Sequence, residues 1–153
     1  MSLRTAALVG VAALTLTGCG SSRQALPKNR LIVPGRSIGP ISLDEPRSAG
    51  TRSLGPGERV RGTLVSYFGG RLLITYWFHD RLTHRVSYLE TTWDGFPTRS
   101  GVRVGTSRGD LPVPRNSCLG GTCAIPLHNG PDAPGTGFRI RQDRVVRIAV
   151  GYG

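Results

Sequence analysis

Acidic residues, lysine and long apolar segments are scarce in this sequence. It has 9 Asp and Glu against 20 Lys and Arg, which gives a formal net charge of +11, and Lys28 is its only lysine. Its one long apolar segment, Thr5–Thr17, has 13 residues. A helix needs about 20 residues to cross the hydrocarbon core of a bilayer. The sequence therefore does not predict a transmembrane helix.

The positive charge is carried almost entirely by arginine and is spread along the chain. A strongly basic surface favours a polyanionic partner such as anionic lipid, a cell-wall polymer or nucleic acid. The same richness in Arg, Gly, Ala and Pro is also produced by the codon bias of a high-GC genome. No run of five or more arginines marks a nucleic-acid-binding segment. We therefore expect no nucleic-acid partner.

The first twenty residues have the features of an export signal. Arg4 supplies a positive charge before the apolar segment, and Leu16-Thr17-Gly18-Cys19 follows it. This order resembles the lipobox of bacterial lipoproteins, in which an aliphatic residue and two small residues precede a cysteine. Small residues give the peptidase access to the backbone, and the thiol accepts the diacylglyceryl group. We predict a signal peptide at residues 1–18 and a lipidated Cys19, which places the mature chain on the cell membrane, facing outside the cytoplasm.

A polar segment separates this signal from the rest of the chain. Residues 19–34 are read as a lipid-anchored tether, and residues 35–153 as a single globular domain. Four basic residues, Arg23, Lys28, Arg30 and Arg36, would lie near the lipid, where a basic side chain gains about 1 kcal/mol beside an anionic surface. The alternative is a plain solvated linker.

Two cysteines remain once Cys19 is set aside. Cys118 and Cys123 flank a Leu-Gly-Gly-Thr segment, and an oxidising exterior favours a disulfide between them. The Gly-Gly pair permits the tight turn that this bond requires. The alternatives are free thiols, or a metal site with His128 as the third ligand. No fourth ligand stands out, so we predict no metal site.

Strand-like segments dominate the chain after residue 60. Leu64–Phe68, Arg71–Phe78 and Leu82–Thr91 are rich in aromatic and branched residues and are separated by turn residues, which predicts an antiparallel meander. Strict alternation puts Val86 and Tyr88 on one face of the third strand. Three more strands are predicted in the second half, at Cys123–Leu127, where Pro126 indicates an edge strand, at Phe138–Arg141 and at Arg144–Val150.

Helical signal is weak throughout. Asp44 is the expected cap of a short helix, with Pro46 in its first turn and Gly50 or Gly55 ending it. Ser107–Asp110 is a weaker version of the same pattern.

The two halves of the chain share a pattern. Ile41-Ser42-Leu43 is followed 61 residues later by Val102-Arg103-Val104, and Asp80-Arg81-Leu82 is echoed by Asp143-Arg144-Val145. We therefore predict an α+β, mostly β fold of two tandem repeats joined at Trp93–Pro97. Each repeat has a short strand, a short helix or coil, and a three-stranded antiparallel meander. The repeats are residues 35–93 and 97–153.

The openings of these repeats resemble a known group of proteins. Gly35–Asp44 and Ser100–Gly105, repeated behind a lipobox, are similar to actinobacterial lipoproteins whose repeats resemble those of the β-lactamase inhibitory protein and the SmpA/OmlA outer-membrane lipoproteins. The resemblance covers residues 35–153 and implies a scaffold or binding role without catalysis. Pro, Gly and Ser interrupt the expected helix here, and no segment matches an inhibitory loop. The resemblance therefore does not imply β-lactamase inhibition.

Candidate functional side chains are few. His79, Asp80 and His84, with a neighbouring hydroxyl group, would suit a small hydrolase. The chain has no His-Glu-x-x-His and no phosphate-binding loop. We favour the alternative, in which Asp80 serves a turn and the histidines are surface residues. No cofactor is expected.

A run of aromatics gives a candidate partner surface. Alternation puts Tyr76 and Phe78 on one face of their strand and Trp77 on the other. Large aromatics in a meander usually fill the core, and an exposed face would mark a partner surface. We predict a membrane-anchored lipoprotein with a non-enzymatic binding or envelope-structural role, whose partner is an envelope protein or an anionic envelope polymer. A ligand- or polyanion-binding module that uses arginines and exposed aromatics is the first alternative, and the hydrolase is the second.

Overall fold

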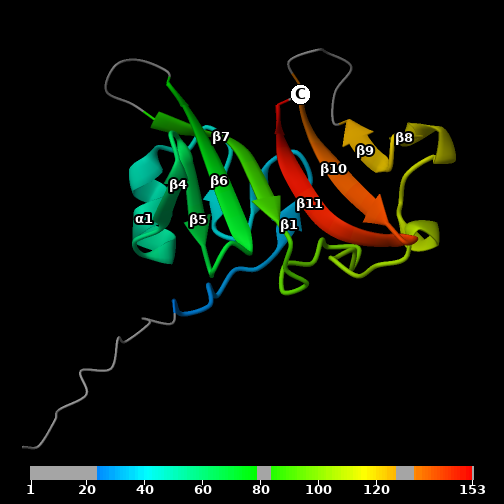
Figure 1. Cartoon of the computed structure of the whole chain (residues 1–153), viewed down its shortest axis with the longest axis horizontal. Helices are drawn as coiled ribbons and strands as arrows, with labels where there is room; N and C mark the ends of the chain where they lie inside the picture. Colours follow the sequence, from blue (N-terminus) through cyan, green and yellow to red (C-terminus); the bar gives the residue numbers. More distant parts are fainter. Residues whose placement is uncertain (1–23, 79–83, 127–132, 153) are drawn as a thin grey trace, which may run out of the picture.

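An eight-stranded antiparallel sheet is the framework of the computed structural model, which describes residues 24–78, 84–126 and 133–152 (Figure 1). Its strand order is β4-β5-β6-β7-β11-β10-β9-β8, so each half of the chain supplies four neighbouring strands. The mostly β prediction is confirmed. The strands are β4 Glu58–Arg61, β5 Leu64–Tyr67, β6 Leu72–Phe78, β7 His84–Thr91, β8 Cys118–Leu119, β9 Thr122–Pro126, β10 Pro134–Arg141 and β11 Arg144–Tyr152.

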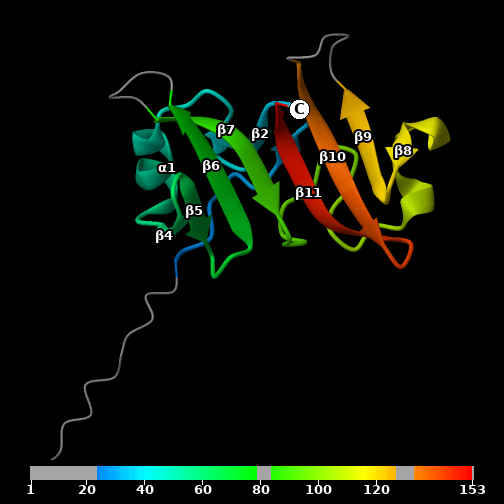
Figure 2. The same cartoon turned by 45° about the horizontal axis from the view of Figure 1, so that its top comes forward.

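A smaller sheet and one helix pack on a single face of this framework. Figure 1 and Figure 2 show them behind the large sheet, whose other face is covered by no other described element. The contacts of β2 and α1 with β7 agree with this arrangement. The elements are β1 Ile32–Val33, β2 Ser37–Ile38, β3 Ile41–Ser42, α1 Arg47–Leu54 and the 3-10 turns η1 Arg108–Asp110 and η2 Arg115–Ser117.

The core lies between the two sheets and is built from branched and aromatic side chains. Each such side chain contributes about 1.5–3 kcal/mol when fully buried. The fully buried members include Ile32, Ile38, Ile41, Leu72, Ile74, Val86, Leu89, Phe96, Phe138, Ile148 and Val150.

The first residues of the domain lie earlier than the predicted boundary. Ile32 is fully buried and pairs with Ile38, and its backbone N–H donates to Pro97 at 2.7 Å. The predicted tether of residues 19–34 is therefore too long, because the chain is part of the fold well before residue 35. The predicted linker Trp93–Pro97 is also not a simple connection, since Phe96 belongs to the core.

A bulge overturns the alternation predicted for β7. Thr75 pairs with Tyr88, but Tyr76 pairs with Val86, so Ser87 is left between the two pairs. The extra residue reverses which side chains point inward. Val86 and Leu89 are therefore both buried, and Tyr88 points to the open face, so the prediction that Val86 and Tyr88 share a face was wrong.

The helix begins later than predicted and without the predicted cap. Pro46 is the N-cap residue, and no side chain caps α1. Asp44 has a φ of 62°, and its N–H donates to the carbonyl of Val86 at 2.8 Å. Asp44 therefore extends the pairing of β7 instead of capping the helix. Gly55, with a φ of 78°, ends the helix as predicted.

Gly50 of α1 gives a test of this packing. A Cβ at Gly50 would lie 2.9 Å from the hydroxyl oxygen of Tyr76. That hydroxyl is buried and has no hydrogen-bond partner among the described residues, and burial raises the pKa of Tyr76 above its usual range. We predict that Gly50→Ala lowers the free energy of unfolding by about 1–2 kcal/mol, although alanine is normally favoured in helices by about 0.5–1 kcal/mol.

Urea unfolding of the single and double variants would measure this effect. Tyr76→Phe removes the hydroxyl, so Gly50→Ala should cost clearly less in that background. A higher urea midpoint for Gly50→Ala alone would contradict the packing described here.

Candidate functional site

The open face of the large sheet is hollowed into a groove over β7, β11, β10 and β9. Its volume is about 430 Å³. The floor is low because the strands carry glycine or alanine where other residues would project side chains. The residues that line the groove are Tyr88, Thr122, Ala124, Ile125, Ala133, Gly135, Thr136, Gly137, Arg139, Arg147, Ala149, Gly151 and Tyr152.

Two tyrosines form the aromatic wall of the groove. Tyr152 stacks on Trp77, with ring centroids 5.5 Å apart and planes 17° apart. Its hydroxyl donates a hydrogen bond to the Asp44 carboxylate, and this bond raises the pKa of Tyr152. The ring of Tyr88 lies against Gly151, where a Cβ would come within 2.5 Å of Tyr88 Cδ2. The wall is thus held by contacts from three segments of the chain.

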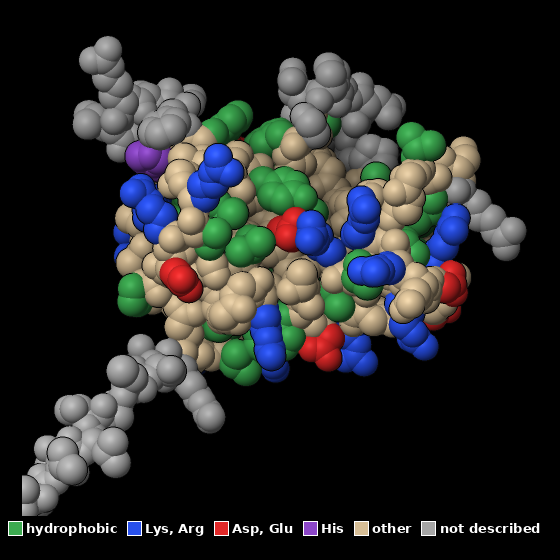
Figure 3. Space-filling model, in the orientation of Figure 1, with side chains coloured by type: hydrophobic (Ala, Val, Ile, Leu, Met, Phe, Trp, Pro, Cys, Tyr) green, Lys and Arg blue, Asp and Glu red, His purple; other side chains and the backbone are tan. Residues whose placement is uncertain are grey.

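The opposite end of the groove is charged. Arg147 Nε lies 3.2 Å from Glu90 Oε1, and Glu90 is only 8% exposed. Burial raises the pKa of Tyr88, and the nearby negative charge of Glu90 raises it further. Arg139 pairs in register with Arg147 on the neighbouring strand. Figure 3 shows basic and acidic side chains side by side near the middle of this face, with hydrophobic ones above them.

The side chains of the predicted partner surface differ in exposure. Trp77 is 42% exposed, on the open face, as alternation required. Tyr76 is 2% exposed and points into the core, so it is not part of a partner surface. The side chain of Phe78 lies outside the described part of the chain. The sequence analysis did not predict the groove. Gly135 and Gly137, two residues apart in β10, could have indicated it, because glycines on one face of a strand leave that face without side chains.

A disulfide joins Cys118 and Cys123, as predicted. The two residues are cross-strand partners in β8 and β9, and Gly120 and Gly121 turn the chain between them with φ values of 57° and 80°. Both glycines are required there because side chains rarely adopt positive φ. No group of three metal-binding side chains occurs among the described residues, and His128 lies outside them.

Two of the three residues of the hydrolase alternative, His79 and Asp80, lie outside the described chain, and the third, His84, begins β7. Gly35–Gly39 matches Gly-x-Ser-x-Gly, a motif that the sequence analysis overlooked. In esterases its serine sits exposed on a turn between a strand and a helix. Here Ser37 lies within β2 and is 7% exposed, so the motif does not present a nucleophile.

A second depression lies where the described chain begins. Its volume is about 1010 Å³, and Gln24, Leu26, Phe68, Arg71 and Trp93 are among its lining residues. The guanidinium of Arg71 lies 5.9 Å from the ring centroid of Trp93. Among the described residues, the groove carries an ion pair and two arginines in register, whereas no ion pair occurs among the residues that line this depression, so the groove is the stronger candidate site.

The Glu90–Arg147 pair is testable by single substitution. Glu90 is nearly buried, whereas the Arg147 side chain is 51% exposed, so removing Arg147 leaves a desolvated carboxylate without its partner. We predict that Arg147→Met lowers the free energy of unfolding by about 1–3 kcal/mol, a loss that Glu90→Gln partly restores in the double variant. Arg141→Met, on an exposed residue of β10, is the matched control and should change stability by less than about 0.5 kcal/mol. Equal losses in the two arginine variants would contradict the importance of the pair.

The predicted lipidation residues, Leu16, Thr17, Gly18 and Cys19, lie outside the described chain. Within the described ranges no helix is long and apolar enough to span a membrane. No protein-family model matches the chain, and neither the curated proteins nor the solved structures searched contain a significant match.

Proposed function

We propose that this protein is an exported, lipid-anchored binding protein of the cell envelope without enzymatic activity. The observation that carries the proposal is the short distance along the chain between Cys19, the last residue of the lipobox, and Gln24, where the chain is fixed to the domain. An acylated Cys19 would hold the domain against the membrane in one orientation.

Gln24 is held by two hydrogen bonds. Its Nε2 donates to the carbonyl of Pro56 at 2.7 Å, and its Oε1 accepts from the N–H of Phe68 at 2.7 Å. A chain extends by at most about 3.6 Å per residue, so five residues would let an acylated Cys19 hold this point within about 18 Å of the membrane. The end of the domain around Gln24 therefore faces the lipid surface.

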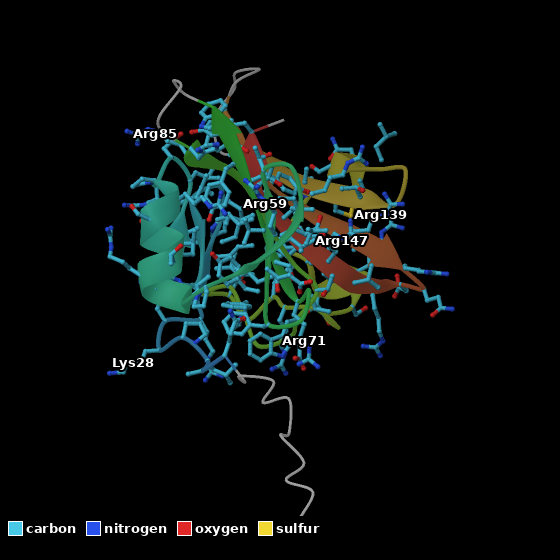
Figure 4. The ribbon with its side chains drawn as sticks, turned by 60° about the vertical axis from the view of Figure 1, so that its left-hand side comes forward. Lys28, Arg59, Arg71, Arg85, Arg139 and Arg147 are labelled. Carbon is cyan, nitrogen blue, oxygen red and sulfur yellow. A yellow bond between two sulfur atoms is a disulfide. The ribbon has the colours of Figure 1, made fainter. Side chains whose placement is uncertain are left out.

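The side chains at this end suit contact with lipid headgroups. Lys28 and Arg71 are exposed, and Leu26 is 53% exposed. Figure 4 shows Lys28 and Arg71 at the end of the domain where the described chain begins. Basic residues gain about 1 kcal/mol each near an anionic membrane surface. The predicted anionic partner is therefore, in part, the membrane that carries the anchor.

The groove lies away from this end. Its wall residue Tyr152 is the last described residue, and Figure 1 shows the C-terminus at the upper edge of the large sheet and the start of the described chain, in blue, below its lower edge. A domain tethered through Cys19 would thus present the groove to the envelope rather than to the bilayer. This orientation supports a binding role for an envelope molecule or protein.

We also propose that the domain consists of two repeats, in line with its resemblance to repeat-containing lipoproteins. Asp44 and Gly105 both have positive φ, and their N–H groups donate to the carbonyls of Val86 and Val145. At the equivalent places Arg85 donates to the Asp44 carbonyl and Arg144 to the Gly105 carbonyl, at 2.6 and 2.9 Å.

The last strands of the two halves, β7 and β11, carry a bulge at positions that correspond when Val86 is aligned with Val145. A bulge at Ser87 in β7 corresponds to one at Val146 in β11. This alignment pairs Arg144 with Arg85, four residues away from Arg81, with which the sequence patterns aligned it. The resemblance implies scaffold or binding function, which agrees with the proposed role.

Acylation is testable on the protein expressed in its own type of envelope. The intact mass should correspond to a chain that begins at Cys19 and carries added acyl groups, and radiolabelled palmitate should be incorporated. Cys19→Ser should lose the label, whereas Cys118→Ser, the matched control, should keep it. An unlabelled wild-type chain, or cleavage at another residue, would refute the anchor.

A further inference from the structure

The paired arginines on the open face carry more positive charge than the described carboxylates balance. Arg139 and Arg147 face each other across β10 and β11, as Figure 4 shows, and Glu90 pairs with Arg147. Arg139 forms no ion pair with any described residue. Like charges directly opposite each other in a sheet are destabilising. An anion bound between the two guanidinium groups would remove this repulsion.

Gly135 and Gly137 form the floor of the groove beside these arginines, and the packing around them does not require glycine. A Cβ at Gly137 would meet its nearest atom, Thr122 Cγ2, at 3.8 Å, and a Cβ at Gly135 would meet the Ile125 carbonyl oxygen at 3.6 Å. Neither glycine has a positive φ. The fold would therefore accept larger residues at both places, and their absence leaves room above the strands.

We propose that the groove binds a small amphipathic anion. Its apolar part lies on the floor of Gly135, Gly137 and Ala149, beside the tyrosine wall, and its phosphate or carboxylate group lies at Arg139 and Arg147. The volume of about 430 Å³ falls within the range of about 300–1,000 Å³ typical of small-molecule sites. This inference rests on the binding role proposed above, but it does not depend on acylation of Cys19.

Calorimetric titration with three probes of one ring system would test the site. The probes are 1-naphthyl phosphate, 1-naphthoate and neutral 1-naphthol, added to the full-length protein in lipid nanodiscs, with empty nanodiscs as the blank. We expect saturable binding of at least one anion, more tightly than 1-naphthol. Preference between the two anions tells whether the natural head group is a phosphate or a carboxylate. If the protein is not acylated, the same titration applies to it in solution.

Two substitutions distinguish specific binding in the groove from nonspecific attraction of anions to a basic protein. Arg139→Gln should weaken anion binding about tenfold and leave 1-naphthol unchanged. Gly137→Val should weaken all three probes, because its side chain occupies the floor. Arg52→Gln removes the same charge from an exposed residue of α1, on the other side of the large sheet, and should leave all affinities unchanged. Absence of saturable binding, or equal losses in Arg139→Gln and Arg52→Gln, would overturn the proposal.

Discussion

The open face of this protein depends on the pairing of β7 with β11. This pairing joins the four strands of the first half to the four of the second, through four residue pairs from Tyr88–Gly151 to Thr91–Ile148. Because Gly151 has no side chain, the ring of Tyr88 can lie against it. Glu90 lies opposite the small residue Ala149 and can therefore reach Arg147 diagonally. Both ends of the groove are thus set at this junction.

Segments with strong local signals could be predicted from sequence. The strands of the meander and the last two strands were expected near their observed positions, because branched and aromatic residues alternate between turn residues there. The disulfide followed from two cysteines and a Gly-Gly turn. Strand β4 could not be recognised, since Val60 is its only apolar residue and all four of its residues are exposed.

Features that depend on distant partners were missed. Ile32 is held in the fold by a backbone hydrogen bond to Pro97, which is far along the chain. The residues next to Ile32 in the sequence do not reveal this contact, so a polar tether was predicted there. The bulge at Ser87 depends on how β6 and β7 pair, and strict alternation cannot anticipate it. Gly135 and Gly137 precede the predicted strand Phe138–Arg141, so they were not expected within a strand, whereas β10 begins at Pro134.

The position of the groove gives the protein two distinct ends. Near Gln24 the domain presents basic and apolar side chains next to the proposed anchor. Near Tyr152 the chain is tied back to the first half, by the hydrogen bond to Asp44 and by stacking on Trp77. These contacts fix the aromatic wall relative to the arginines, which is the preorganisation that a small ligand requires.

Mapping backbone amide chemical shifts during titration with 1-naphthyl phosphate tests the central claim most directly. Our account predicts that the largest changes occur at Gly135, Gly137, Ala149 and Gly151, on the open face at the junction of the two halves. Changes concentrated around Arg71 and Trp93, or spread evenly over the exposed arginines, would contradict it.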